Sequence, residues 1–178
     1  MRILYLDFDG VLHHERVYFE PERGFFIHAG PQFRLFQHAE LLSDLLRPYP
    51  DVKIVLSTAW VRQLGADGAA SQLPLELRTK VIGSTSDRCL NEDDFWQMPR
   101  GQQVSQDVLV RTPTHVLAVD DSEDGWPSAL KDFLVVTNSV LGISEPEVLE
   151  LLKQRLKLAF QDDRGGSVAA NHRETPLG

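Results

Sequence analysis

Two pairs of aspartates and one Ser-Thr pair stand out in the sequence because each directly follows an apolar run. If the four aspartates lie together, their carboxylates repel one another and raise one another's pKa unless a cation neutralises them. An all-oxygen ligand set, completed by water and a substrate phosphate, suits Mg²⁺ better than Zn²⁺ or a dedicated Ca²⁺ cage. The residues of this predicted site are Asp7, Asp9, Asp120 and Asp121, with Ser57 and Thr58 beside them.

The elements that must position these residues are predicted as alternating strands and helices. Most of the apolar runs are β-branched and nearly continuous, as expected for strands of a parallel sheet covered on both faces. Helical periodicity is clearest over residues 39–46 and from Pro146 to about Phe160, where Ser144 and Glu145 are placed to open the helix. This alternation predicts an α/β fold: a three-layer, doubly wound, Rossmann-like sheet of about five parallel strands. The strands are expected at residues 3–6, 53–56, 81–82, 115–119 and 133–136.

All three polar clusters then fall at the carboxyl ends of strands, which is where open parallel sheets bind their ligands. Gly10 directly follows Asp9. A glycine there lets the chain turn sharply and lets a phosphate approach the backbone closely.

Chain length and composition favour one domain. A chain of 178 residues with 42% hydrophobic content can bury one substantial core and is short for two. We expect a domain over residues 1–161 and a disordered tail over 162–178, where apolar periodicity is absent. No apolar run approaches the roughly 20 residues that cross a bilayer, so no membrane partner is expected. The single cysteine, Cys89, and a strand-like N-terminal run predict a cytoplasmic location.

The formal net charge of −8 bears on the class of partner. Its field repels polyanions, so a nucleic acid would need a local basic patch that works against the global charge. A phosphorylated small molecule is therefore the favoured partner, and nucleic acid the alternative. The sequence leaves the oligomeric state open.

With this pattern, the chain resembles the haloacid dehalogenase (HAD) superfamily of aspartyl-phosphate hydrolases over roughly residues 2 to 137. The resemblance rests on Asp7-Phe8-Asp9-Gly10-Val11 after the first strand and on the Ser-Thr and Asp-Asp pairs after later ones. More narrowly, the segments 56–62 and 81–85, together with Arg100, resemble a small branch described as HAD domains related to Swiss Army Knife RNA-repair proteins.

The resemblance implies a role for each residue of the site. Asp7 would be the nucleophile that forms an aspartyl-phosphate, and Asp9 the general acid and base, with its backbone carbonyl also reaching the metal. Asp120 would bind Mg²⁺ directly and Asp121 directly or through water. Ser57 or Thr58 would donate a hydrogen bond to a phosphoryl oxygen; we favour Ser57.

The family also places a cation beside the phosphate, commonly a lysine near the start of the helix before the fourth strand. This chain has no lysine between Lys80 and Lys131, and Arg100 lies in roughly the expected place. Arg62, one helical turn past Ser57, is the competing candidate, because a guanidinium can bind phosphate through two hydrogen bonds.

The segment between the first strand and the first helix is too short for a large cap domain. It can hold a β-hairpin flap, with residues 17–19 paired to residues 25–27, and this leaves the site fairly open. His13 and His14 follow the nucleophile loop, and a structural or solvent-facing pair is the expected reading. Trp60 is expected to serve packing.

The function predicted from these residues is Mg²⁺-dependent hydrolysis of a phosphomonoester whose identity stays open. One alternative is a phosphatase that processes nucleic-acid ends in RNA or DNA repair. The other is a HAD-fold binding domain with weakened catalysis, suggested by the missing lysine. The presence of both Asp7 and Asp9 argues against the binding domain, because a pure binder needs no general acid.

Overall fold

The structure is a computed structural model that describes residues 1–87, 89 and 91–161. The predicted tail, 162–178, lies outside the described residues. None of the described helices is both long enough and apolar enough to cross a bilayer.

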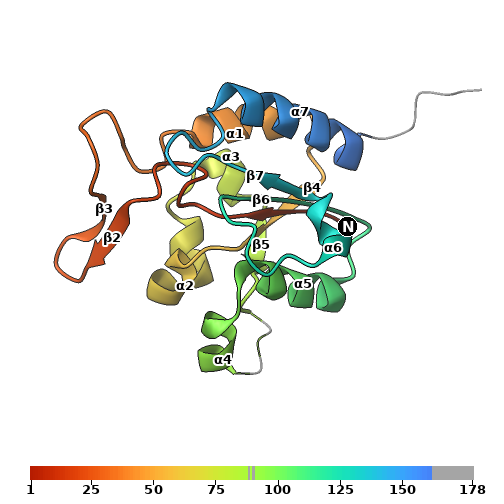
Figure 1. Ribbon diagram of the computed structural model, residues 1–178, viewed down its shortest axis with the longest axis horizontal. Coiled ribbons are helices and arrows are strands. Elements are labelled where there is room, and N and C mark those ends of the chain that lie inside the picture. The colour runs from red at the N-terminus through yellow and green to blue at the C-terminus, as the bar shows by residue number, and fades with distance from the viewer. Residues whose placement is uncertain (88, 90, 162–178) are drawn as a thin grey trace, which may run out of the picture.

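A five-stranded sheet in which all neighbouring strands run parallel forms the centre of the fold (Figure 1). The order places β1 between β4 and β6, so that Leu6 pairs with Leu56 on one side and with Val119 on the other. Strand order reverses at β1, which makes the carboxyl ends of β1 and β6 the topological switch point of the sheet. The strands, in spatial order, are β5 (Val81–Ser84), β4 (Val52–Leu56), β1 (Arg2–Leu6), β6 (His115–Asp120) and β7 (Leu134–Val136).

Helices cover both faces of the sheet, as Figure 1 shows, with α1 and α7 on one side and α5 on the other. Leu4 and Leu6 of β1 belong to the larger apolar cluster, and Ile3 and Tyr5 to the smaller one, because successive side chains of a strand point to opposite faces. The predicted three-layer α/β fold is therefore confirmed. The helices are α1 (Ala39–Leu46), α2 (Trp60–Ala70), α3 (Leu75–Arg78), α4 (Glu92–Gln97), α5 (Arg100–Arg111), α6 (Ser128–Lys131) and α7 (Pro146–Phe160).

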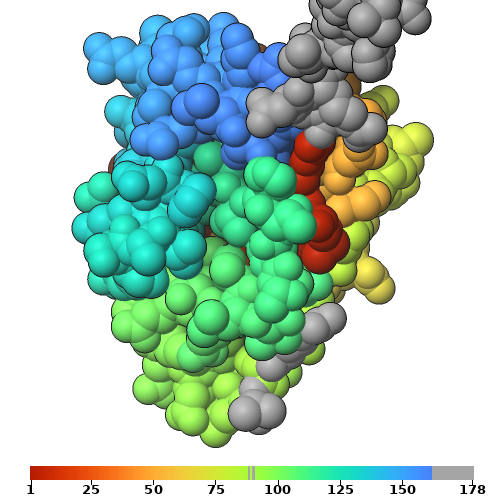
Figure 2. Space-filling model, turned by 90° about the vertical axis from the view of Figure 1, so that its right-hand side faces the viewer, coloured from red at the N-terminus to blue at the C-terminus, as the bar shows by residue number. Residues whose placement is uncertain are grey.

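The longest helix, α7, begins where the sequence predicts. The side chain of Glu145 accepts a hydrogen bond from the backbone N–H of Val148, and Pro146 occupies the first turn, where its missing N–H costs nothing. Leu152 and Leu156 of this helix are fully buried against the sheet. Figure 2 shows α7 in blue at the top of the molecule, and the start of the chain, in red, where it reaches the surface.

The predicted flap is a two-stranded antiparallel hairpin of β2 (Val17–Glu20) and β3 (Gly24–Ile27), with Tyr18 paired to Phe26. It projects from the carboxyl-terminal end of the sheet, at the left of Figure 1. It is the only regular element between β1 and α1 in the described chain, so no large cap is inserted there. The hairpin therefore leaves that end of the sheet open.

Candidate active site

Three carboxylates meet at the topological switch point of the sheet. Asp7 directly follows β1, Asp120 is the last residue of β6, and Asp121 comes next. One carboxylate oxygen from each of the three residues lies within 4.8 Å of those of the other two. Asp7 and Asp120 are only 6% and 2% exposed. The parallel pairing of β1 with β6 thus brings together two buried residues, Asp7 and Asp120, that are more than a hundred positions apart in the chain.

The electrostatics of this cluster show the cost of its burial. Burial raises the pKa of Asp7 well above its ordinary value; the Arg100 guanidinium opposes the rise, and the carboxylates of Asp120 and Asp9 add to it. Burial likewise raises the pKa of Asp120 to about 6 and raises the pKa of Asp121. A cation bound here would stabilise the charged carboxylates.

The residues present fit a Mg²⁺ ion. Oδ2 of Asp120 is buried and accepts no hydrogen bond from the described residues. A buried carboxylate oxygen without a donor is the kind of atom that a cation satisfies, and a purely oxygen donor set suits Mg²⁺. The carboxylate of Asp9 is not part of the cluster, so its predicted contact with the ion would come from its backbone carbonyl.

Gly10 forms the predicted turn after Asp9, with φ of +69°. Its carbonyl accepts a hydrogen bond of 2.6 Å from Oγ1 of Thr137, the residue after β7. Sequence reasoning did not single out Thr137, although it also stands directly after a strand. The turn that carries Asp9 is therefore tied to the far strand of the sheet.

Ser57 and Thr58 both lie at the end of β4, and both are 1% exposed. Oγ1 of Thr58 accepts a 3.5 Å hydrogen bond from the backbone N–H of Trp60, at the start of α2. Oγ of Ser57 is buried without a hydrogen-bond partner among the described residues. The hydroxyl of Ser57 is therefore available to donate to a ligand, and Ser57 stays the favoured candidate for the phosphate donor.

Arg100, the first residue of α5, lies between the two buried aspartates. Its Nη2 is 3.8 Å from Oδ1 of Asp7, and its Nε is 3.6 Å from Oδ2 of Asp120. Its Nη1 donates a 3.1 Å hydrogen bond to Oε1 of Gln103, a buried side chain that was not expected to support the site. These contacts hold a guanidinium over the predicted nucleophile.

The position of α5 depends on Gly101. A Cβ at this residue would lie 2.3 Å from the backbone nitrogen of Trp126, so only glycine lets the first turn of α5 pack this closely on the loop after β6. Arg62, by contrast, is exposed on α2 and borders a hollow that also contains Glu92 and Asp93. The structure therefore places Arg100, and not Arg62, beside Asp7.

Asp9 has two partners that the sequence did not indicate. Its Oδ1 lies 2.9 Å from Nε2 of His13 and 2.9 Å from the indole Nε1 of Trp60, which donates to it. Both histidines of the pair are buried. His14 packs on Phe33, as expected for a structural residue, whereas His13 contacts the predicted general acid. In the sequence, only the short separation of four residues between Asp9 and His13 could have indicated this contact.

The hairpin is joined to the site through an aromatic contact. The ring of Phe25 stacks on the indole of Trp60, with centroids 3.6 Å apart and planes 11° from parallel. Tyr18 and Phe19 of the same hairpin are 49% and 38% exposed. The flap thus anchors one aromatic side chain on Trp60, the indole that donates to Asp9, and leaves Tyr18 and Phe19 partly exposed.

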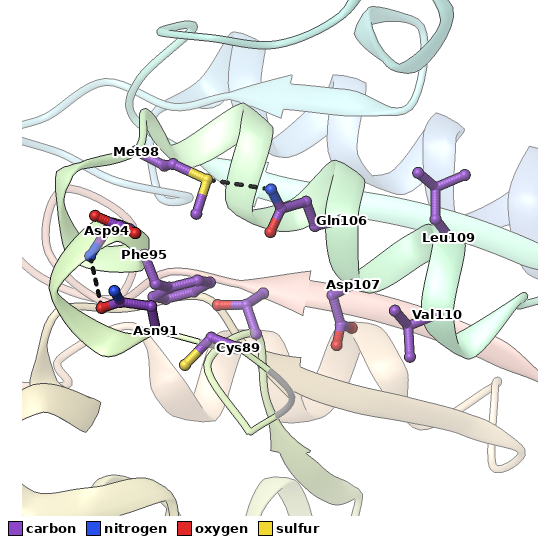
Figure 3. A pocket seen from close by; sticks show the side chains of 10 residues that line it. Cys89, Asn91, Asp94, Phe95, Met98, Gln106, Asp107, Leu109 and Val110 are labelled. Carbon is purple, nitrogen blue, oxygen red and sulfur yellow. Dashed lines mark hydrogen bonds between the residues drawn. The ribbon is translucent and has the colours of Figure 1, made fainter.

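A separate hollow of about 560 Å³ lies between α4 and α5 and contains none of the predicted site residues (Figure 3). Phe95, Met98 and Gln106 line it, and the Gln106 amide donates a 3.2 Å hydrogen bond to the Met98 sulfur. The predicted site residues lie elsewhere, at the open end of the sheet.

The parallel sheet, with its acidic cluster at the switch point, defines a HAD-type α/β domain. The family model described as "HAD domain in Swiss Army Knife RNA repair proteins" matches residues 3–148, so the chain belongs to this family. Comparison with curated proteins and with solved structures gave no match. Family membership makes the chain a domain of the HAD-hydrolase class.

Proposed function

We propose that the chain is a Mg²⁺-dependent phosphomonoester hydrolase that acts through an aspartyl-phosphate on Asp7. The observation that carries this proposal is the meeting of Asp7, Asp120 and Asp121, with carboxylate oxygens within 4.8 Å of one another at the open end of the sheet. One buried carboxylate is then available to attack phosphorus, while the others bind the cation that lets a phosphate approach.

The proposed reaction has two displacements. In the first, a carboxylate oxygen of Asp7 attacks phosphorus, the bond to the ester oxygen breaks, and Asp9 gives its proton to the leaving alkoxide, which departs as an alcohol. In the second, Asp9, now ionised, takes a proton from water as the water oxygen attacks the same phosphorus. The bond to Asp7 breaks, and inorganic phosphate leaves.

The surrounding residues stabilise charge on the phosphoryl oxygens. The Ser57 hydroxyl has no hydrogen-bond partner in the described part of the chain and can donate to one of these oxygens. The guanidinium of Arg100 can donate to others in place of the family's lysine. Asp7, Asp120, Asp121 and the Asp9 carbonyl would hold Mg²⁺, which would supply positive charge to offset the repulsion of the phosphate by the attacking carboxylate.

The proposed substrate is a phosphorylated small molecule, because the net charge of −8 disfavours a polyanion. A nucleic-acid end is the second candidate. It is supported by the RNA-repair description of the family and by the exposed aromatic side chains of Tyr18 and Phe19, on which a base could stack. A cytoplasmic location is part of the proposal, since a single thiol suits a reducing compartment.

A substrate screen tests the proposal. Purified protein with Mg²⁺ is assayed for phosphate release from sugar phosphates, nucleotides, p-nitrophenyl phosphate and oligonucleotides phosphorylated at the 3′ or 5′ end. Activity should vanish with EDTA and return with Mg²⁺. It should fall by about three orders of magnitude or more in Asp7→Asn, whose amide cannot attack phosphorus.

The matched control is Asp124→Asn, which changes an exposed aspartate on the loop after β6 and should leave the rate unchanged. Full activity in Asp7→Asn would exclude the covalent mechanism. Phosphate binding with Mg²⁺ but no turnover of any substrate would favour a binding domain instead.

A further inference from the structure

His13 connects the predicted general acid to a backbone group on a distant segment. Its Nδ1 accepts a 3.1 Å hydrogen bond from the backbone N–H of Phe36, so the ring hydrogen of this tautomer is on Nε2. Nε2 lies 2.9 Å from Oδ1 of Asp9 and donates to it. One tautomer therefore satisfies both contacts, and the imidazole has a fixed orientation.

The donor on Phe36 is itself held in place by local structure. Phe36 has φ of +56°, a left-handed conformation that residues other than glycine rarely adopt. Its ring packs edge-on against His13 and against Trp60, with centroids 4.9 Å and 5.0 Å away. The packing that keeps this unfavourable backbone also aims its N–H at the imidazole.

Trp60 supplies the second donor to the same atom. Its Nε1 donates a 2.9 Å hydrogen bond to Oδ1 of Asp9. The indole is 1% exposed; the ring of Phe25 stacks on it, and the ring of Phe8 packs against it at 73°. Neither donor can rotate away without disturbing a packed aromatic cluster.

Both donors meet Oδ1, which leaves Oδ2 for the substrate. The Asp9 side chain is 31% exposed, whereas that of His13 is fully buried, so the carboxylate is held from its buried side. We propose that His13 and Trp60 are positioning residues that hold Asp9 so that Oδ2 transfers the proton to and from the reacting oxygen. This inference rests on the proposed function, in which Asp9 is the general acid and base.

Two substitutions at His13 separate its proposed role in positioning Asp9 from a purely structural role. His13→Asn places an amide oxygen near Nδ1, where it can still accept from Phe36, but it removes the donor to Asp9. His13→Gln places an amide nitrogen near Nε2 and keeps that donor. His14→Asn is the matched control, because His14 also accepts from a backbone N–H, that of Arg16, and contacts Phe33 rather than Asp9.

The readout is kcat/KM, which reports the first displacement, for an alkyl phosphate compared with p-nitrophenyl phosphate, whose leaving group needs no proton. Misplacing a general acid slows the first displacement of the substrate that needs its proton, so His13→Asn should lower kcat/KM for the alkyl phosphate by about tenfold or more relative to the aryl phosphate. His13→Gln should recover most of the loss, and His14→Asn should keep the wild-type ratio.

A second measurement tests whether His13 acts through Asp9. In an Asp9→Asn background, His13→Asn should cause no further loss, because the group that it positions is already gone. An additional loss of the same size as in wild type would overturn the inference. Equal losses of kcat/KM for alkyl and aryl substrates, or equal losses in the Asn and Gln variants, would also overturn it.

Trp60→Phe keeps the aromatic packing and removes the second donor to Asp9. If both His13 variants fail to fold, the ratio of alkyl to aryl phosphate activity in Trp60→Phe tests the inference instead. The failure of this inference is distinct from that of the proposed function. A wild-type chain inactive on every substrate would overturn the proposed function and this inference together. An active wild type whose ratio is unchanged in the variants would overturn this inference alone.

Discussion

The carboxylate of Asp121 occupies the space that a side chain at residue 10 would need. A Cβ built on Gly10 would lie 2.2 Å from Oδ2 of Asp121, and the backbone of Gly10 has φ of +69°. The glycine of the nucleophile loop therefore does more than permit a turn. It lets an acidic residue from the loop after β6 lie against the loop that carries Asp7 and Asp9.

Gly10→Ala should thus weaken Mg²⁺ binding as well as the fold. The left-handed backbone alone costs about 1–2 kcal/mol when glycine is replaced, and the displaced Asp121 carboxylate should lower Mg²⁺ affinity by roughly tenfold or more. Gly24→Ala is the control, because Gly24 has φ of +76° but nothing within 4 Å of the added Cβ. Calorimetric titration with Mg²⁺ measures the difference; equal affinities in the two variants would contradict this reading.

Ser57→Ala and Thr58→Val should have opposite effects. Ser57→Ala removes a buried hydroxyl that has no hydrogen-bond partner among the residues described, so stability should be unchanged or rise by up to about 1 kcal/mol, while kcat falls by about tenfold to a hundredfold. Thr58→Val removes the acceptor for the Trp60 N–H and should lower stability with less effect on kcat. Urea unfolding and steady-state kinetics check both, and a larger kcat loss in Thr58→Val would transfer the phosphate contact to Thr58.

Arg100→Gln should reduce kcat/KM by about tenfold to a thousandfold, because it removes a charged donor beside the phosphate site. Arg62→Gln removes the same charge from the exposed surface of α2 and should leave kcat/KM within about twofold of wild type. Each variant loses one positive charge, so the two have the same net charge and differ only in where the charge is removed. Should Arg62→Gln prove the more damaging change, the assignment of the phosphate cation to Arg100 would be wrong.

The metal-free protein should become less stable as the pH rises through the range in which Asp120 ionises. The pKa of Asp120 is about 6 in the folded protein and 3.8 ordinarily, so the folded state binds the proton more tightly. Protonated Asp120 therefore adds up to about 3 kcal/mol to the free energy of unfolding below about pH 4. This added stability falls as the pH rises and is largely lost by about pH 6. Mg²⁺ should restore stability above pH 6 and have little effect at pH 4.

Asp120→Asn provides the test of that linkage. With EDTA at pH 7 it should unfold at a higher temperature than wild type, and at pH 4 the two proteins should unfold at similar temperatures. Added Mg²⁺ should raise the unfolding temperature of wild type and of Asp124→Asn at pH 7, but that of Asp120→Asn much less. A difference between wild type and Asp120→Asn that stays constant with pH would refute the assignment.

The fold and the acidic cluster could be predicted from the sequence because both depend on local pattern. Continuous apolar runs define the parallel strands, and a residue placed directly after such a run must lie at the carboxyl end of the sheet. Asp7 and Asp120 follow from this rule alone. Glu145 and Pro146 mark the start of α7 in the same way, since capping is a relation between residues close in the chain.

Tertiary structure alone decided which side chains meet within the site. The choice of Arg100 over Arg62 depends on how closely Gly101 lets α5 approach the loop after β6. The two partners of Asp9 come from separate segments: His13 is oriented by the backbone of Phe36, and Trp60 begins a helix some fifty residues away. Sequence pattern encodes periodicity and neighbours along the chain, whereas contacts between distant segments are set by packing. The sequence could therefore identify the aspartates, but not the residues that hold Asp9 in place.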